Sequence, residues 1–150
     1  MNKPASPTKR ILLAEDDEDD FILFQEALGE YKDTVRLDWV VDGEELMNIL
    51  KIKIAELPDI IFLDINMPRK NGFECLTEIR QNENLKHLPV IIFSTSNDPA
   101  LISWMYNAGA NLYLTKPSDF KSLKEKIQKA IAMDWKIYTP HSAVKDFVLS

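Results

Sequence analysis

The stretch that decides the fold is ILLAEDDEDD, at residues 11–20. The apolar residues 11–14 have the length and composition of a buried strand, and six carboxylates follow them without a break. Such a cluster is unfavourable beside a buried strand, because each carboxylate loses water and repels its neighbours. The junction therefore predicts a bound cation, a helix start that offsets the charge, or both.

Four more short apolar runs follow along the chain, and helical patterns lie between them. The runs occupy residues 35–41, 60–63, 90–93 and 112–114. In the intervening segments apolar residues recur at three- or four-residue spacing, and one helix is predicted from residue 43 to about residue 55. This alternation is typical of an α/β fold, in which helices cover both faces of a parallel sheet.

Length and charge exclude several classes of function. With 150 residues the chain is long enough for one domain with a proper core. Its formal charge of −6 argues against nonspecific binding to nucleic acid or to an anionic membrane. The sequence shows neither a membrane span nor a signal peptide, and the single Cys75 fits a reducing compartment. We therefore expect a cytoplasmic protein whose thiol is packed rather than reactive.

Polar side chains follow four of the apolar runs at the point where each run ends. Glu15 and Asp16 follow the first run, Asp64 the third, Ser94 the fourth and Lys116 the fifth. Ligands of parallel α/β sheets bind at the carboxyl ends of the strands. These residues therefore predict one functional site at a single edge of the sheet.

The residue types at this edge predict phosphoryl chemistry. Carboxylates from two strands favour a hard divalent cation, and Mg²⁺ prefers a few carboxylates together with water and a substrate phosphate. Asp64 is the best candidate for the nucleophile, because a carboxylate can form an acyl phosphate when a metal ion screens its charge. Ser94 would donate a hydrogen bond to one phosphoryl oxygen, and Lys116 would pair with another.

The chain resembles the receiver domain of two-component response regulators over roughly residues 9 to 132. The motifs that carry the resemblance are ILLAEDD, DIIFLDINMPRKNG, PVIIFSTS and GANLYLTKP, in this order. It implies a flavodoxin-like (βα)5 doubly wound parallel sheet with strand order 2-1-3-4-5. It also implies that Asp64 accepts a phosphoryl group from a histidine kinase or a phosphotransfer protein. Such a protein is not an enzyme on external substrates, since it catalyses only phosphorylation and dephosphorylation of its own aspartate.

The resemblance assigns further roles around Asp64. Asp16 would bind Mg²⁺ directly and Glu15 through water, and the backbone carbonyl of Asn66 would complete the protein ligands. The bond between Lys116 and Pro117 resembles the cis peptide of the family.

Other residues would couple the site to a signalling surface. Ser94 takes the position of the family's switch hydroxyl, with Thr95 as the alternative, and Tyr113 takes the position of the aromatic that swings inward. Thr95 and Ser96 lie near the phosphate, and Asn66 and Ser96 would flank the path of attacking water. The surface formed by the fourth helix, fifth strand and fifth helix would then bind a downstream protein.

The ends of the chain are expected to differ from the receiver itself. Residues 1–8 are predicted to be flexible. Residues 133–150 are too short for an output domain, and they would pack back on the receiver, extend the last helix or bind a partner. Residues 82–89 resemble stand-alone receivers that partner bacterial phytochromes. A homodimer stays open as an alternative, whereas direct nucleic-acid or membrane partners are not expected.

Two other functions remain as alternatives at this point. A Mg²⁺-dependent aspartyl phosphohydrolase would need a second Asp where this chain has Asn66. A receiver that binds partners without phosphate would lack a pocket residue, yet all are present. Within the acidic run, Glu18, Asp19 and Asp20 are assigned to capping the first helix, and a role of Asp17 in the pocket is left open.

Overall fold

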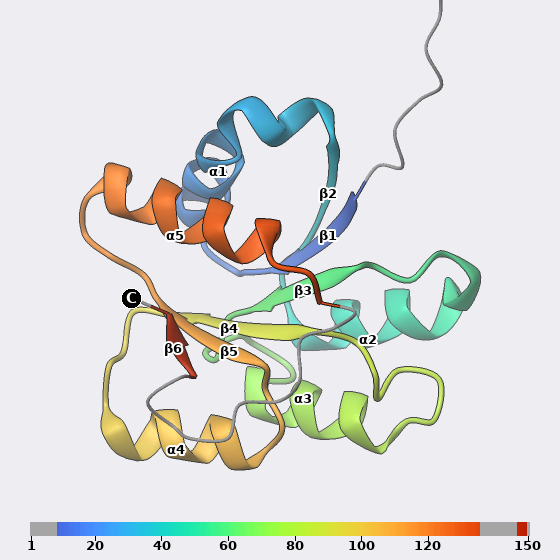
Figure 1. Cartoon of the computed structure of the whole chain (residues 1–150). Coiled ribbons are helices and arrows are strands. Elements are labelled where there is room, and N and C mark those ends of the chain that lie inside the picture. Colours follow the sequence, from blue (N-terminus) through green and yellow to red (C-terminus); the bar gives the residue numbers. More distant parts are fainter. Residues whose placement is uncertain (1–8, 136–146, 150) are drawn as a thin grey trace, which may run out of the picture.

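The computed structural model describes residues 9–135 and 147–149. A parallel sheet with strand order β2-β1-β3-β4-β5-β6 forms its centre (Figure 1). The strands are β1 Lys9–Ala14, β2 Val35–Val40, β3 Ile60–Leu63, β4 Val90–Ser94, β5 Leu112–Thr115 and β6 Val148–Leu149. The α-helices are α1 Glu18–Ala27, α2 Gly43–Ile52, α3 Gly72–Gln81, α4 Pro99–Asn107 and α5 Phe120–Ala132. The predicted fold and the order 2-1-3-4-5 are confirmed, and β6 extends the sheet beyond β5.

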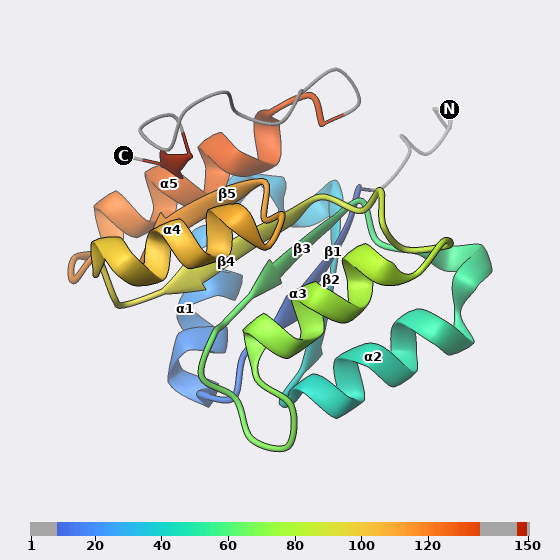
Figure 2. The same ribbon diagram turned by 90° about the horizontal axis from the view of Figure 1, so that it is seen from below.

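Helices cover both faces of the sheet. Helices α1 and α5 lie on one face, and α2, α3 and α4 lie on the other (Figures 1 and 2). On the first face Phe24 of α1 packs in one core with Ile127 of α5, and both side chains are fully buried. On the second face Leu46, Leu76 and Met105 come from the three helices and share the other core. Every residue of β3 and β4 is buried, as expected for central strands covered on both sides.

Side-chain caps fix where the helices begin. The caps are Asp42 for α2, Asn71 for α3, Asp98 for α4 and Asp119 for α5. The predicted end of α2 at about residue 55 is wrong, because the helix stops at Ile52 and a 3₁₀ turn, Ile54–Glu56, follows. Leu50 is the last buried residue of α2, and Ile52 is 79% exposed. Without apolar burial, tertiary packing does not support another α-helical turn.

Cys75 lies where α2 and α3 meet. Its side chain is buried, and its thiol donates a hydrogen bond to the carbonyl of Gly43 at 3.5 Å. Burial raises the pKa of the thiol to about 12. The thiol is therefore packed and stays protonated, as the sequence predicts.

Gly72 holds the loop after β3 close to the start of α3. Its N–H donates to the carbonyl of Ile65 at 2.8 Å. A Cβ atom at residue 72 would lie 2.4 Å from the carbonyl oxygen of Asp64 and 2.8 Å from Cα of Ile65. Both are backbone atoms, so a side chain at this position would displace the residue that carries the predicted phosphoryl acceptor.

We therefore expect Gly72→Ala to destabilise the protein by about 2 kcal/mol, since overpacking against backbone cannot be relieved by a rotamer change. Urea unfolding measures this as a lower midpoint with an unchanged slope. Ser103→Ala, at an exposed position of α4, is the control and should leave the midpoint unchanged. Equal midpoints for Gly72→Ala and wild type would contradict the close approach.

The described part of the C-terminal segment packs on the edge of the sheet. Val148 and Leu149 pair in parallel with Tyr113 and Leu114 of β5. Phe147 is fully buried, and its ring lies 5.5 Å from that of Tyr106 and 6.1 Å from that of Tyr113. The chain thus covers the free edge of β5 with its own residues. Residues 1–8, for which flexibility is predicted, and 136–146 lie outside the described residues.

Candidate functional site

Backbone hydrogen bonds continue the sheet one residue beyond three strands and so place the predicted site residues. The N–H of Glu15 donates to Val40 at 3.0 Å, and the N–H of Asp64 donates to Ala14 at 3.0 Å. The N–H of Lys116 donates to the carbonyl of Ser94 at 2.7 Å. The ladder therefore holds the backbone of each residue as it leaves the sheet, and the side chains converge at one edge.

Three carboxylates meet at this edge. One carboxylate oxygen each from Glu15, Asp16 and Asp64 lies within 4.8 Å of the other two. Glu15 is fully buried and Asp64 is 8% exposed, whereas Asp16 is open to solvent. The arrangement offers a cation two enclosed ligands and one that solvent can reach, as a partly hydrated divalent ion requires.

Burial dominates the electrostatics of the two enclosed acids. It raises the pKa of Glu15 to about 8, against the opposing effect of the Lys116 ammonium. It also raises the pKa of Asp64, and the same ammonium again opposes the shift. Without a metal ion these acids therefore resist ionisation. A divalent cation would favour the ionised forms, so the donor set fits such an ion.

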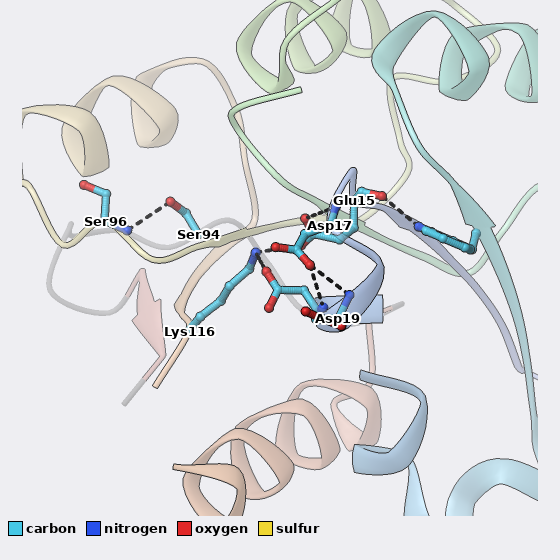
Figure 3. Close-up of polar contacts among 8 residues, drawn as sticks. Glu15, Asp17, Asp19, Ser94, Ser96 and Lys116 are labelled. Carbon is cyan, nitrogen blue, oxygen red and sulfur yellow. Dashed lines mark hydrogen bonds and ion pairs between the residues drawn. The ribbon is translucent and has the colours of Figure 1, made fainter. Parts of the chain in front are cut away.

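Lys116 forms the cationic side of the site. Its Nζ lies 2.6 Å from Oε1 of Glu15 and 3.0 Å from Oδ2 of Asp20 (Figure 3). It also lies 4.7 Å from the centroid of the Phe93 ring. Burial lowers the pKa of Lys116, but the hydrogen bond that its ammonium donates to Glu15 and the charge of Asp64 outweigh this effect and leave the pKa above its usual value. The ammonium therefore stays charged inside a pocket of acids.

The roles of the acids at residues 17–20 differ from the predicted ones. Asp17 caps α1, since its Oδ1 accepts the N–H groups of Asp19 at 2.8 Å and of Asp20 at 3.3 Å. The assignment of the cap to Glu18, Asp19 and Asp20 is wrong, because these residues already lie in the first helical turn. Side chains of a helix tilt toward its N-terminus, and this tilt brings Asp20 back to Lys116. The sequence carries no signal for this contact, because it depends on where α1 lies relative to Lys116.

A hydrogen-bonded relay connects the hydroxyl of Ser94, at the end of β4, to Tyr113 through the backbone of Ser96. The Oγ of Ser94 accepts the N–H of Ser96 at 3.1 Å, and the hydroxyl of Tyr113 donates to the carbonyl of Ser96 at 2.7 Å. Ser94 is 2% exposed and Tyr113 is fully buried, whereas Thr95 is exposed. Burial is the largest cause of the raised pKa of Tyr113. The side chain of Tyr113 is therefore held inward beneath the loop that carries Ser96.

The predicted cis peptide between Lys116 and Pro117 is wrong, since no cis bond occurs in the described residues. The trans isomer is the more stable one for X–Pro bonds by about 0.5–1 kcal/mol, and Lys116 reaches Glu15 and Asp20 with the bond in this form. The side chain of Asn66 is exposed beside the site, so its amide points to solvent while its backbone follows Asp64 by two residues.

Trp39 of β2 is a contributor that the sequence reading missed. Its indole N–H donates to the carbonyl of Glu15 at 2.7 Å. Its ring also stacks on Phe21 of α1, with centroids 4.1 Å apart and planes 4° from parallel. Phe21 is thus half-buried by packing, whereas Ile22 and Leu23 remain 42% and 39% exposed. The sequence signal that could have predicted this contact is an indole N–H near the end of the strand next to β1.

Comparison with known proteins decides the family. Residues 11–128 match the response regulator receiver domain. The chain belongs to this family. Rcp1, a response regulator of Synechocystis sp., is 36% identical over 132 residues, which span 85% of this chain and 90% of Rcp1. The family predicted from the motifs is therefore confirmed.

Solved structures extend the similarity to the fold. The Mn²⁺-bound form of Rcp1 has a TM-score of 0.77 and 33% identity, covering 89% of this chain and 99% of that one. The phosphorylated cyanobacterial phytochrome response regulator RcpA has a TM-score of 0.78 and 34% identity, covering 91% and 99%. A divalent metal in the acidic cluster of this receiver domain agrees with the Mn²⁺-bound form of Rcp1. In the described part of this chain no helix has the length and apolar character needed to cross a bilayer.

Proposed function

We propose that Asp64 accepts a phosphoryl group, with Mg²⁺ as cofactor, from a histidine kinase or a histidine phosphotransfer protein. The observation that carries this proposal is the set of groups around Asp64. Acids from β1 lie on one side of its carboxylate, and the ammonium of Lys116 and the hydroxyl of Ser94 come from the strands next to β3 and beyond. Asp64 remains 8% exposed, so a donor can reach it.

The reaction follows from this arrangement. A carboxylate oxygen of Asp64 attacks the phosphorus atom, a P–O bond forms, and the P–N bond to the donor imidazole breaks in line with it. The leaving imidazole takes a proton from water. Lys116 and Ser94 each bind one phosphoryl oxygen, which positions the group and offsets its charge. Glu15, Asp16, Asp64 and the backbone carbonyl of Asn66 would hold Mg²⁺, which would supply further charge neutralisation.

The same pocket also sets the return to the unphosphorylated state. Water must attack the phosphoryl group from the open side, where the exposed Asn66 and Thr95 and the half-buried Ser96 lie. Hydrolysis regenerates Asp64 and releases inorganic phosphate. The protein therefore acts on its own aspartate, and its product is a change of state rather than a converted substrate.

The signalling surface is proposed to be α4, β5 and α5, together with residues 147–149, which cover the edge of β5. The Ser94 hydroxyl accepts a hydrogen bond from the N–H of Ser96, and the carbonyl of Ser96 accepts one from the hydroxyl of Tyr113 of β5. A phosphoryl group that binds Ser94 therefore favours one arrangement of this relay over others. Trp104 of α4 is 54% exposed, but its ring lies 4.5 Å from that of Phe73 of α3, so it offers an apolar side chain to a partner on the α3 side of this surface.

The upstream kinase is proposed to be a sensor of the phytochrome type. RcpA is a cyanobacterial phytochrome response regulator, and RPA3017, which is 29% identical with a TM-score of 0.78, is a response regulator in red light signalling. The exposed Ile22 and Leu23 of α1 lie on the helix that begins at the acidic site. They are suited to contact a kinase that must approach that edge.

Intact mass after incubation with Mg²⁺ and acetyl phosphate tests the phosphoryl acceptor. We expect one phosphoryl adduct on wild type, none without Mg²⁺, and none on Asp64→Ala. Asp59→Ala is the matched control, because it removes an exposed aspartate just before the opposite end of β3 and should leave the adduct intact. Absence of the adduct on wild type would favour a receiver that binds partners without phosphate. Steady release of phosphate from simple monoesters would favour a phosphohydrolase.

A further inference from the structure

Asp20 has no role in the proposed reaction, yet its carboxylate forms an ion pair with Lys116, which the reaction needs. Its Oδ2 lies 3.0 Å from Nζ of Lys116, whose side chain is only 9% exposed. Asp20 belongs to the first turn of α1 and is separate from the carboxylates of Glu15, Asp16 and Asp64 that form the cation cluster.

Lys116 is paired with two acids other than the proposed phosphoryl acceptor. Its ion pairs in the described part of the chain are with Glu15 and Asp20, and the ring of Phe93 lies along its remaining side. A phosphoryl group on Asp64 needs an N–H of this ammonium. The ion pair with Asp20 therefore engages an N–H that the phosphoryl group could otherwise accept.

The ion pair with Asp20 is the one expected to yield. It is the longer of the two, at 3.0 Å against 2.6 Å for Glu15. The Asp20 side chain is 31% exposed and the Glu15 side chain only 1%, so water can replace the lysine at Asp20 but not at Glu15. Replacing the lysine by water thus costs less free energy at Asp20 than at Glu15.

Charge also opposes a phosphoryl group while Asp20 is present. The ionised acids Glu15, Asp16 and Asp64 balance a divalent cation together with the Lys116 ammonium. Asp20 leaves one negative charge uncompensated beside the ammonium, and phosphorylation of Asp64 adds another. We propose that Asp20 competes with the incoming phosphoryl group for Lys116 and thereby limits how readily Asp64 becomes phosphorylated.

This inference rests on the proposed function and is tested by Asp20→Asn with Asp19→Asn as control. Both substitutions remove one negative charge from the same helical turn, but only Asp20 bonds to Lys116. We expect Asp20→Asn to lower by about fivefold the acetyl phosphate concentration that gives half-phosphorylation. Asp19→Asn should leave this concentration unchanged within about twofold.

Binding of trifluoroberyllate, a phosphoryl mimic, supplies a readout without chemistry. Its Kd in the presence of Mg²⁺ should fall about fivefold in Asp20→Asn and change little in Asp19→Asn. Thermal midpoints of both variants show whether folding is intact, and Asp20→Ala repeats the test without an amide in place of the carboxylate. If the role of Asp20 were purely structural, Asp20→Asn would lower the thermal midpoint, and the Kd values of Asp20→Asn and Asp19→Asn would not differ.

The outcomes separate the two proposals. If wild type forms no adduct, the phosphoryl acceptor itself fails. If wild type is phosphorylated and both variants respond equally, the general charge of α1 acts and competition at Lys116 is overturned. If Asp20→Asn weakens phosphorylation or trifluoroberyllate binding, Asp20 orients the lysine and the proposed competition is likewise overturned.

Discussion

Lys116→Met is expected to slow phosphorylation of Asp64 by acetyl phosphate about 100-fold, which is the usual effect of removing one donor that binds charge in the transition state. Methionine keeps an unbranched apolar chain in a pocket that is only 9% exposed, so the contact with Phe93 survives while the charge is lost. The initial rate of adduct formation, followed by intact mass at saturating Mg²⁺, measures the effect.

The same substitution should leave the protein folded near neutral pH. Burial already raises the pKa of Glu15 to about 8, so this acid can take up a proton when the ammonium is removed. Lys124→Met is the matched control, because the side chain of this α5 residue is 38% exposed and its ion pair with Glu30 is long, at 3.9 Å. Equal rates for Lys116→Met and Lys124→Met would show that Lys116 does not bind the phosphoryl group.

Much of the site follows from the sequence because a parallel sheet converts strand order into proximity. Asp64 and Lys116 are far apart in the chain, yet each follows a strand whose carboxyl end must lie at the same edge. Short apolar runs located those ends to within one residue for β3, β4 and β5. The residues that carry the proposed chemistry could therefore be predicted from the sequence alone.

Other features depend on directions in space that the order of residues does not contain. Asp20 reaches Lys116 only because α1 turns back across the end of the sheet, and periodicity gives no such angle. Trp39 caps the carbonyl of Glu15 through a side chain that also packs, so its apolar surface concealed its role as a donor. The pairing of Val148 with Tyr113 joins β5 to a segment for which no strand is predicted from the sequence.

The metal-free protein is expected to lose stability as the pH rises from 6 to 8. The pKa of Glu15 is about 8 in the folded chain against an ordinary value of 4.5, and the pKa of Asp64 is raised in the same direction. Below pH 4.5 the Glu15 carboxyl is protonated in both states, and its contribution to stability is complete. Between these values the unfolded chain is ionised while the folded chain still holds the proton, so stability falls by up to about 1.4 kcal/mol per pH unit.

A divalent cation should reverse this dependence, because it binds the ionised carboxylates and not the protonated ones. Urea unfolding in a chelator at pH 6 and pH 8 should differ by at most about 3 kcal/mol, with pH 6 the more stable. Mg²⁺ should then stabilise the protein more at pH 8 than at pH 6. Glu15→Gln, which cannot ionise, should flatten both effects, since burial of this carboxylate is their main source. A metal-free protein whose stability is constant or rises over this range would contradict the burial of a protonated Glu15.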